Sequence, residues 1–362
     1  MRIVYVCNFS YPFWEGVWNN VYHLSKAMIK KGNEVHVFSS NLNPTGEKSS
    51  YYEVFQGINI HRFDVKYKIG SYGLFFDFEK EMIELKPDLV HAHVYRNPCA
   101  HKSLEIAKKL NIPCFLTTHA PFERKRDFIS SSFVNYYDYV LGKKILNSYT
   151  KVIAITKWEI PHIINLGLKK GNLEYIPNGV EREFLIKINN KKNRQVIYIG
   201  RISEIKNPGL LVQVAKYFKD LKFKIFGPIE KDYKISSKTK NLKIVNSKYD
   251  SKTEIKLLEE SDIYILPSKS EGFPQTLLEA MAAGKIVIAS ATKGSLELIR
   301  EGKNGFIFYD FNDLIRKIRY CDDNYYKLLQ VRKNAQDTAK NFLWENITDK
   351  INKVYSEDSR SQ

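Results

Sequence analysis

The sequence is poor in cysteine and contains no long apolar run. Four cysteines occur among 362 residues, and they form no Cys-x-x-Cys pair and no metal-binding spacing. Cys7 and Cys114 fall in strand-like runs, so we expect buried, reduced thiols in a cytoplasmic protein rather than disulfides. No run approaches the roughly 18 apolar residues of a membrane-spanning helix. The apolar stretch between Arg2 and Asn8 is also too short and too polar for a signal peptide.

The composition is otherwise that of an ordinary globular protein. Hydrophobic residues make up 43% of the chain and charged residues 27%, which excludes an intrinsically disordered protein. A chain of 362 residues is too long for one typical hydrophobic core. We therefore expect two domains.

Positive charge is in excess, with 57 Lys and Arg against 40 Asp and Glu and a net charge of +17. The excess is spread over both halves, as expected of a lysine-rich, solvated surface. The alternative is attraction to anionic lipid headgroups, which would make the protein peripheral on the inner membrane face, or to a phosphorylated acceptor. The sequence contains no recognisable nucleic-acid-binding module, so we expect no nucleic-acid partner.

The first half alternates between strand-like and helix-like segments. Strands at Ile3–Val6 and Glu34–Ser39 flank a helix at Val17–Lys31, and this βαβ order predicts a parallel sheet. Further strands are predicted at Ile58–Phe63, Asp88–His93, Pro113–Thr118, Thr150–Ile155 and Leu173–Val180.

A polar, lysine-rich stretch, residues 187–194, predicts the linker between the domains. A second alternation follows it, so the predicted fold class is α/β with two Rossmann-like halves. The strands predicted in this half are Gln195–Ile199, Phe223–Phe226, Leu242–Val245, Asp262–Pro267, Lys285–Ala289 and Phe306–Tyr309. The helices predicted there are Pro208–Phe218, Lys252–Glu260 and Trp344–Tyr355.

The most informative stretch is Ser268–Gly284, which reads SKSEGFPQTLLEAMAAG between two apolar runs. The loop opens at the carboxyl end of a predicted strand, where open α/β sheets bind ligands. Pro274 suits the first position of a helix. The N–H groups of a first helical turn are a natural seat for phosphate. Here we expect the free N–H groups to be those of Gln275, Thr276 and Leu277.

Two carboxylates flank that turn, Glu271 in the loop and Glu279 in the second helical turn. A glutamate at a helix start often complements the helix dipole, and one in the second turn is usually solvated. Their position beside a phosphate-type turn in an apolar segment favours a functional role.

A glycine and two basic residues follow another predicted strand, at Gly200, Arg201 and Lys206. The planar fork of arginine suits paired phosphate oxygens, and the lysine ammonium acts as a point charge. Alone the pair is a weak signal among 57 basic residues. Because the Glu271 loop is expected at the same sheet edge, the combination predicts contact with a diphosphate.

Histidines stand at the predicted carboxyl ends of two strands, at His93 and His119. Such histidines are often structural. The positions favour a role in the ligand site for His119 and leave both readings open for His93. The pair His91-Ala-His93 suggests a metal site, but no third ligand has a convincing spacing, so no metal is predicted.

A basic cluster at Glu123–Arg126 (ERKR) precedes the aromatic-rich segment Phe133–Tyr139. This order predicts either docking on a membrane surface or a solvated turn before a core helix.

The segment EGFPQTLLEAMAAGKIVIAS resembles the Glu-x7-Glu motif of family 4 glycosyltransferases, which are retaining enzymes of the GT-B fold. GRISEIKNPG, Asn178-Gly179 and Trp344 resemble further parts of the family pattern. The resemblance implies two Rossmann-like domains whose parallel sheets face each other across a cleft. Residues 1–186 would form the acceptor-side domain and residues 194–341 the donor domain, with the helix in 342–358 crossing back to the N-terminal domain.

The same resemblance implies transfer of a sugar from a UDP- or GDP-sugar to a glycan, lipid-linked or small-molecule acceptor, without a cofactor or metal. Arg201 and Lys206 would stabilise the departing diphosphate. Glu279 would bind the ribose hydroxyls, Glu271 the sugar hydroxyls, and His119 would lie against the sugar. The donor-binding residues expected are Gly16, His93, Asn178, Gly200, Gly272, Phe273, Pro274, Gln275, Thr276, Leu277, Glu279 and Tyr249.

Two departures from the family pattern concern the acceptor and the base. Glu15-Gly16 replaces a frequent pair of glycines, which places a carboxylate near the predicted acceptor site. NSKYDS replaces a glycine-containing turn and makes Tyr249 the candidate to stack on the base. The rival functions are a nucleotide-sugar epimerase or sugar phosphorylase, and a non-catalytic sugar-nucleotide or anionic-lipid binding protein. The chain keeps all four charged residues of the motifs, which argues against a non-catalytic binding protein: Arg201, Lys206, Glu271 and Glu279.

Overall fold

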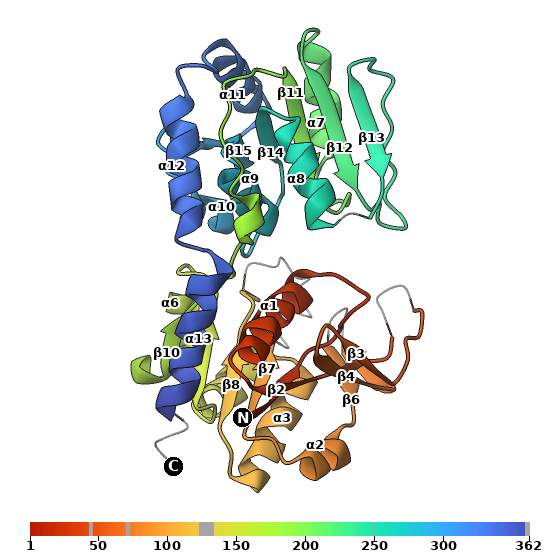
Figure 1. Cartoon of the computed structure of the whole chain (residues 1–362), viewed down its shortest axis with the longest axis vertical. Coiled ribbons are helices and arrows are strands. Elements are labelled where there is room, and N and C mark those ends of the chain that lie inside the picture. The colour runs from red at the N-terminus through yellow and green to blue at the C-terminus, as the bar shows by residue number, and fades with distance from the viewer. Residues whose placement is uncertain (43–45, 70–72, 123–133, 249, 359–362) are drawn as a thin grey trace. The chain divides into compact units, whose positions relative to one another are not determined.

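The chain folds into two α/β units, seen in the computed structural model of Figure 1. The structure describes residues 1–42, 46–69, 73–122, 134–248 and 250–358. The first unit comprises Met1–Asn178 together with Glu345–Gln362, and the second comprises Gly179–Trp344. Both have the predicted α/β architecture, in which a parallel sheet carries helices on its two faces.

The first unit contains a sheet of order β10-β9-β8-β7-β1-β2-β4-β3. Its strands pair in parallel except for β3 and β4, which are antiparallel. The strands are β1 (Arg2–Val6), β2 (Glu34–Ser40), β3 (Tyr52–Phe55), β4 (Ile58–Phe63), β7 (Leu89–His93), β8 (Cys114–Thr117), β9 (Lys151–Ala154) and β10 (Leu173–Tyr175). A separate antiparallel pair is formed by β5 (Val65–Ile69) and β6 (Gly73–Phe76).

The second unit contains a parallel sheet of order β13-β12-β11-β14-β15-β16. Numbered within the unit, this is the 3-2-1-4-5-6 order of a doubly wound fold, whose direction of winding reverses between β11 and β14. The strands are β11 (Gln195–Ile199), β12 (Lys222–Gly227), β13 (Leu242–Asn246), β14 (Ile263–Leu266), β15 (Ile286–Ser290) and β16 (Phe306–Phe308).

Helices connect these strands and cover the sheets. Those of the first unit are α1 (Gly16–Lys30), α2 (Glu79–Leu85), α3 (Pro98–Leu110), α5 (Lys143–Leu146) and α6 (Ile160–Asn165). Those of the second unit are α7 (Gly209–Val214), α8 (Ser251–Glu259), α9 (Gln275–Ala282), α10 (Lys293–Leu298), α11 (Phe311–Asp323) and α12 (Leu329–Lys340). The last helix is α13 (Trp344–Asp358).

The central strands are apolar along their whole length because both of their faces are covered. Every residue of β14 is buried, as are Ile3 to Val6 of β1. Continuous apolar runs are typical of parallel strands between two helical layers, and this explains why these strands were predictable. All four cysteines are buried with free thiols, and this includes Cys7 and Cys114, for which burial was predicted.

The boundary between the units differs from the predicted linker at residues 187–194. The first unit ends at Asn178, because the next residues already belong to the core of the second. The Val180 N–H donates to the Phe342 carbonyl (2.8 Å), and the Phe184 side chain is buried in the second unit. Residues 187–194 are polar because most of them are solvent-accessible within the second unit.

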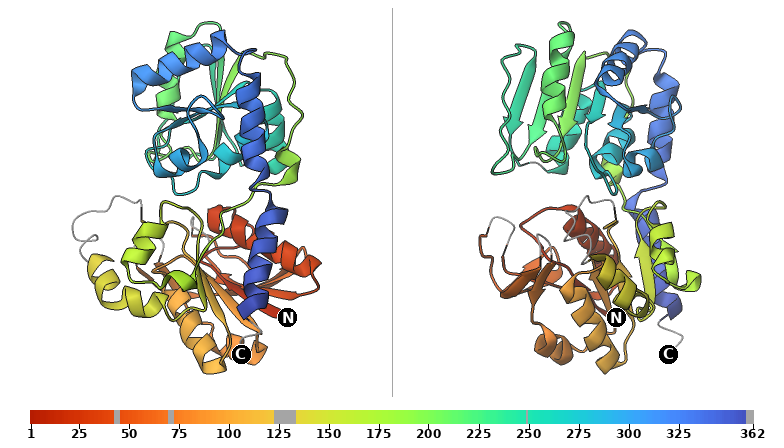
Figure 2. Two further views of the ribbon diagram at one scale, coloured as in Figure 1. Left: turned by 90° about the vertical axis from the view of Figure 1, so that its left-hand side faces the viewer. Right: turned by 180° about the vertical axis from the view of Figure 1, so that it is seen from behind.

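The last helix returns to the first unit, as predicted. Figure 2 shows α13 running along the first unit, and its residues Ile347 and Ile351 are buried. The Tyr355 hydroxyl lies 2.5 Å from His91 Nδ1 on β7 and 3.4 Å from the Tyr5 hydroxyl on β1. The helix is thus fixed to the central strands by buried polar contacts as well as by apolar packing.

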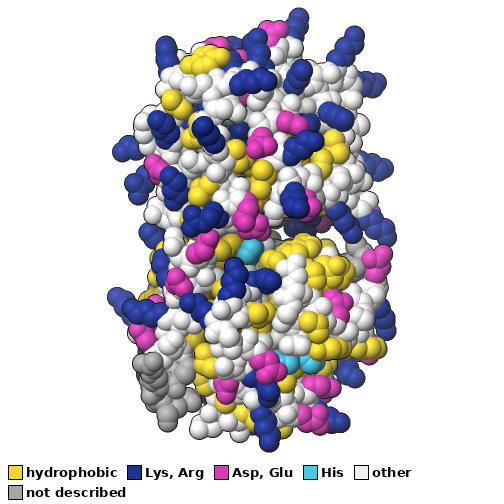
Figure 3. All heavy atoms as spheres, viewed as in Figure 1, with side chains coloured by type: hydrophobic (Ala, Val, Ile, Leu, Met, Phe, Trp, Pro, Cys, Tyr) yellow, Lys and Arg dark blue, Asp and Glu magenta, His cyan; other side chains and the backbone are white. Residues whose placement is uncertain are grey.

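None of the helices among the described residues is long and apolar enough to cross a membrane. Lysine and arginine side chains are scattered over the face shown in Figure 3 rather than gathered in one patch.

Replacing Tyr355 with phenylalanine tests the anchoring of α13. Loss of the hydroxyl leaves His91 Nδ1 buried without its partner. An unsatisfied buried group costs about 1–3 kcal/mol, so we expect Tyr355→Phe to lower the melting temperature by several degrees in calorimetry. The matched control is Tyr320→Phe on α11, whose ring is exposed. Equal melting temperatures for the two variants would contradict the anchoring role.

Candidate active site

The predicted site residues of the second unit gather where β11 and β14 end. These strands pair in parallel, with Val196 opposite Ile263 and Ile197 opposite Tyr264. They are the neighbours between which the winding of the sheet reverses, the position at which open α/β sheets bind ligands. The loop after β11 carries Gly200 and Arg201, and the loop after β14 carries Glu271.

Close backbone contact fixes the loop after β11. Gly200 has a φ of +149° and Gly227, at the end of β12, a φ of +147°. A Cβ atom at Gly227 would lie 1.9 Å from the Gly200 carbonyl oxygen, so this position accepts only glycine. Gly200 therefore acts through the backbone, while the Tyr198 hydroxyl donates to the Arg201 carbonyl (2.7 Å).

The Arg201 guanidinium points to solvent. Its side chain is 49% exposed, and the ion pair described for it is a long one, 4.0 Å to Glu230 Oε1. An exposed, weakly held guanidinium can turn towards an incoming anion at little cost.

Lys206 and Glu271 form the central contact of the site. Lys206 Nζ lies 2.7 Å from Glu271 Oε1 and 2.9 Å from Oε2. The Ser268 hydroxyl donates to Oε1 as well (2.5 Å). The Glu271 side chain is only 6% exposed, so its charge needs these partners. Ser268 was not predicted, although it lies in the motif three residues before Glu271.

Helix α10 contacts the backbone of the loop that carries Glu271. The Gly294 N–H donates to the Glu271 carbonyl (3.1 Å). A Cβ atom at Gly294 would lie 2.6 Å from the Gly272 carbonyl oxygen, so a larger residue would displace the loop. Gly294 was missed because nothing in its local sequence marks a close approach.

The start of α9 differs from the prediction by one residue. Pro274 precedes the helix, with φ −80° and ψ 89°, and the helix begins at Gln275. The Pro274 carbonyl accepts hydrogen bonds from the N–H groups of both Leu277 and Leu278, each at 3.2 Å. The prediction that the Leu277 N–H is free was therefore wrong, because the bent chain at Pro274 turns that carbonyl into the helix. Within the described residues, no partner is recorded for the N–H groups of Gln275 and Thr276.

The side chains of α9 divide between the core and the polar groups of the site. Leu277 is fully buried in the core, and Phe273 packs against the same core. The Thr276 hydroxyl accepts from the Tyr264 hydroxyl (2.7 Å). Gln275 Nε2 donates to the Gly179 carbonyl (2.7 Å) and to Glu279 Oε1 (3.1 Å).

Glu279 is buried beside a second carboxyl group rather than solvated. Burial raises the pKa of Glu279 to about 7. Burial and the neighbouring Glu279 raise the pKa of Glu254, on α8, well above its ordinary value. Glu254 consequently holds a proton and donates it to Glu279, while Glu181 adds negative charge. Glu254 comes from a different helix, so no spacing in the sequence indicated it.

The histidines of the first unit form a chain of neutral rings. His93 Nδ1 lies 2.9 Å from His119 Nε2. Burial lowers the pKa of His119 to about 3 and that of His93 well below its usual range. His93 Nε2 is buried, and the described part of the chain offers it no hydrogen-bond partner. His91 is structural, because it bonds Tyr355 and the Thr117 hydroxyl (2.8 Å).

Glu159 holds the turn that carries His119, which has a φ of +58°. This buried carboxylate accepts from the Ala120 N–H (3.0 Å) and the Thr118 hydroxyl (2.7 Å). The N–H groups of Ile155 and Thr156 donate to its other oxygen at 2.7 and 3.0 Å. Sequence reasoning missed Glu159, since its partners come from two segments, residues 118–120 and 155–156, of which the first is distant in the sequence.

The remaining predicted residues lie elsewhere in the first unit or outside the described residues. Gly16 begins α1, and a Cβ atom there would meet nothing within 4 Å. Asn178 Oδ1 accepts from Asn20 Nδ2 (2.8 Å). Tyr249 and the ERKR cluster at residues 123–126 lie outside the described residues.

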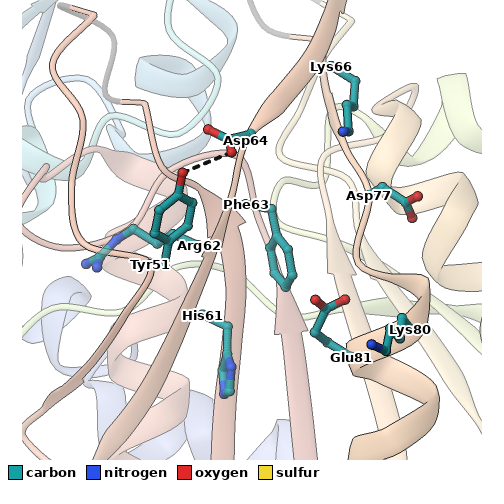
Figure 4. A pocket seen from close by; sticks show the side chains of 9 residues that line it. All are labelled: Tyr51, His61, Arg62, Phe63, Asp64, Lys66, Asp77, Lys80 and Glu81. Carbon is teal, nitrogen blue, oxygen red and sulfur yellow. Dashed lines mark hydrogen bonds between the residues drawn. The ribbon is translucent and has the colours of Figure 1, made fainter.

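A hollow of about 510 Å³ in the first unit lies apart from all of these groups. Figure 4 shows its lining, which comes from β4, β5, α2 and the segments beside them. Three acidic and three basic residues line it together with Tyr51, His61 and Phe63: Asp64, Asp77, Glu81, Arg62, Lys66 and Lys80. Mixed charge favours no one ligand, so we do not assign the site there. In the portion of the chain that is described, no cluster of three or more His, Cys, Asp or Glu is arranged to hold a metal.

Each half of the chain matches a family of known proteins. Residues 14–184 match the family described as Glycosyltransferase Family 4, and residues 181–342 match Glycosyl transferases group 1. An uncharacterised glycosyltransferase of Methanocaldococcus jannaschii is 26% identical, with 96% of each chain covered. The α-monoglucosyldiacylglycerol synthase of Acholeplasma laidlawii is 25% identical over 95% of this chain and 94% of that protein.

Solved structures show the same fold. Sucrose-phosphate synthase from Thermosynechococcus elongatus superposes with a TM-score of 0.79, at 16% identity and with 100% of both chains covered. Anabaena HepE in complex with UDP-glucose gives a TM-score of 0.73, at 17% identity, with 99% of this chain and 100% of that chain covered. These likenesses show the GT-B fold with its two Rossmann-like domains.

Glu254→Gln tests the shared proton. Burial raises the folded pKa of both carboxyl groups above the ordinary 4.5, to about 7 for Glu279, so the stability that the protonated pair contributes is present below about pH 4.5 and is lost as pH rises through the two folded pKa values. Glutamine keeps a donor for Glu279 without an ionisable group. We expect Glu254→Gln to melt several degrees above the wild type at pH 8 and to depend less on pH.

The control for that measurement is Glu259→Gln, an exposed position on the same helix. It should follow the wild-type pH dependence in scanning calorimetry at pH 5 to 8. Parallel curves for wild type and Glu254→Gln would show that no proton is shared.

Proposed function

We propose a reaction for this chain, which belongs to the group 1 glycosyltransferases: retaining transfer of a sugar from a UDP- or GDP-sugar to a glycan or lipid-linked acceptor. The observation that carries the proposal is the ion pair of Lys206 with Glu271, which joins the loop after β11, where Arg201 also lies, to the loop that leads into α9. Two cations beside a helix N-terminus are suited to a diphosphate.

The charge of the departing diphosphate is the main demand of this reaction. Its negative charge increases as the bond to the sugar breaks, and pre-positioned donors stabilise that charge. Lys206 is already held in place by Glu271, so its ammonium requires little reordering. Arg201 is exposed and supplies the second cation. The N–H groups of Gln275 and Thr276 complete the set at the positive end of α9.

Retention follows a front-face course in this proposal. The bond between C1 of the sugar and the phosphate oxygen breaks, and its electron pair leaves with the diphosphate. The acceptor oxygen bonds C1 from the same face, and its proton passes to a departing phosphate oxygen. No carboxylic acid is needed to protonate this leaving group, unlike in glycosidases. Glu271 is therefore assigned to the sugar hydroxyls.

Glu279 is assigned to the ribose hydroxyls. The pKa of Glu254 is raised by burial and by the neighbouring Glu279, which favours Glu254 as the protonated member and Glu279 as the acceptor of the pair. Hydroxyl groups that donate to a carboxylate make strong, charge-assisted hydrogen bonds. The assignments of Gly16, His93, His119 and Asn178 in the first unit stay predictions, as does stacking of Tyr249 on the base.

The names of similar proteins support a nucleotide-sugar donor and a lipid acceptor, but they identify neither the sugar nor the base for this chain. One similar structure contains UDP-glucose, and one relative is named for the synthesis of a glucosylated diacylglycerol. A thermal-shift screen of UDP- and GDP-sugars would identify the donor, because a ligand of the folded state raises the melting temperature.

Lys206→Ala and Arg201→Ala test the diphosphate assignment. We expect each variant to lower kcat/KM for release of the nucleoside diphosphate by about 100-fold or more, because each removes a group that stabilises the leaving charge. Arg201→Ala should keep the wild-type melting temperature, since its side chain has no buried partner. Lys219→Ala, an exposed lysine of the same unit, is the matched control. Wild-type activity in both site variants would refute the assignment.

A chelator tests the metal-independent part of the proposal. With two protein cations and helix N–H groups on the diphosphate, excess EDTA should leave the transfer rate within about twofold of its untreated value. Loss of activity that Mg²⁺ or Mn²⁺ restores would show that a metal takes part.

A further inference from the structure

A short helical segment of the first unit presents large apolar side chains to solvent. It spans residues 134–146, includes a π-turn at Asp138–Gly142 and ends in α5; it can be followed in yellow in Figure 2. Within six residues, Tyr136 is 68% exposed, Tyr139 89%, Val140 48% and Leu141 42%. Four exposed apolar side chains within six residues exceed the scattered single residues that are normal on a protein surface.

The opposite face of this segment is fixed to the body of the first unit. The Asp138 carboxylate pairs with the Arg96 guanidinium and accepts from the Tyr95 hydroxyl (3.1 Å). The Tyr137 hydroxyl bonds His101, and Leu146 is fully buried. These contacts attach the segment to the first unit through its inner side chains, and the four apolar side chains named above are left exposed.

Lysines surround the carboxyl end of the same segment. Lys143 and Lys144 belong to α5, while Lys169 and Lys170 follow α6. Asn147 joins the two places, since its Nδ2 donates to the Gly167 carbonyl (2.9 Å) and its Oδ1 accepts from the Lys169 N–H (3.0 Å). Among the described residues, no ion pair is recorded for any of these lysines.

We propose that this aromatic–lysine face docks on an anionic lipid bilayer. The face is defined as Tyr136, Tyr139, Val140, Leu141, Lys143, Lys144, Lys169 and Lys170. Aromatic side chains partition into the headgroup region, and each lysine near an anionic surface adds electrostatic attraction. An apolar centre bordered by unpaired cations matches a bilayer surface in both hydrophobicity and charge.

Docking would bring the enzyme to an acceptor that resides in the membrane. In that respect the inference rests on the proposed function and narrows its acceptor to the lipid-linked class. Binding to vesicles itself requires neither a donor nor turnover, so the two proposals can fail separately.

Vesicle sedimentation of the full chain tests the docking face. We expect the protein to sediment with vesicles of phosphatidylglycerol and phosphatidylcholine but not with phosphatidylcholine alone. The variant Tyr139→Ser/Val140→Ser and the variant Lys143→Gln/Lys144→Gln should each reduce partitioning about tenfold or more. Added salt should weaken the binding that the lysines provide.

Matched substitutions in the second unit supply the control. Tyr309→Ser/Lys219→Gln changes an exposed tyrosine and an exposed lysine outside the proposed face, and should bind vesicles like the wild type. All variants should keep the wild-type melting temperature and donor-induced thermal shift. Equal binding of face and control variants, or no binding to anionic vesicles, would overturn the docking proposal. Wild-type vesicle binding without any donor-induced shift would count against the proposed reaction alone.

Discussion

The ion pair of Lys206 with both oxygens of Glu271 connects the two loops on which the candidate site depends. These residues are 65 positions apart in the chain, and they meet because β11 and β14 are neighbours where the sheet winding reverses. A carboxylate as buried as Glu271 must be paired with a cation. The contact therefore neutralises Glu271 and at the same time holds the Lys206 ammonium in place. The site therefore holds a cation in position before any anion binds.

Helix α9 arranges the rest of the site along its axis. Its first turn offers the N–H groups of Gln275 and Thr276 at the positive end of the helix dipole. One turn further, Glu279 shares a proton with Glu254 in a buried setting. In the proposed function, the first turn of α9 binds the diphosphate and Glu279 binds the ribose hydroxyls, so one helix serves neighbouring groups of the donor.

Much of this arrangement could be predicted from the sequence, because apolar runs with helical segments between them specify a parallel sheet, and the carboxyl ends of its strands share one edge. That reasoning placed Lys206 and Glu271 at the same sheet edge, where the structure shows their ion pair. It could not give the bond from the Leu277 N–H to the Pro274 carbonyl, which depends on the bend before the helix. It also missed Glu254, whose contact with Glu279 arises from the packing of two helices. The domain boundary was misplaced because an exposed loop has the composition of a linker.

Val180 and Leu343 form a β-bridge that joins the two ends of the second unit. The chain enters the second unit at Gly179 and leaves it at Trp344, and backbone hydrogen bonds join these two crossing points. The second unit is therefore an insertion, with its own ends side by side, into the chain of the first unit. Chain ends that lie close together are the usual condition under which insertion of a domain is tolerated. That property agrees with the separate family matches of the two halves, which meet within residues 181–184.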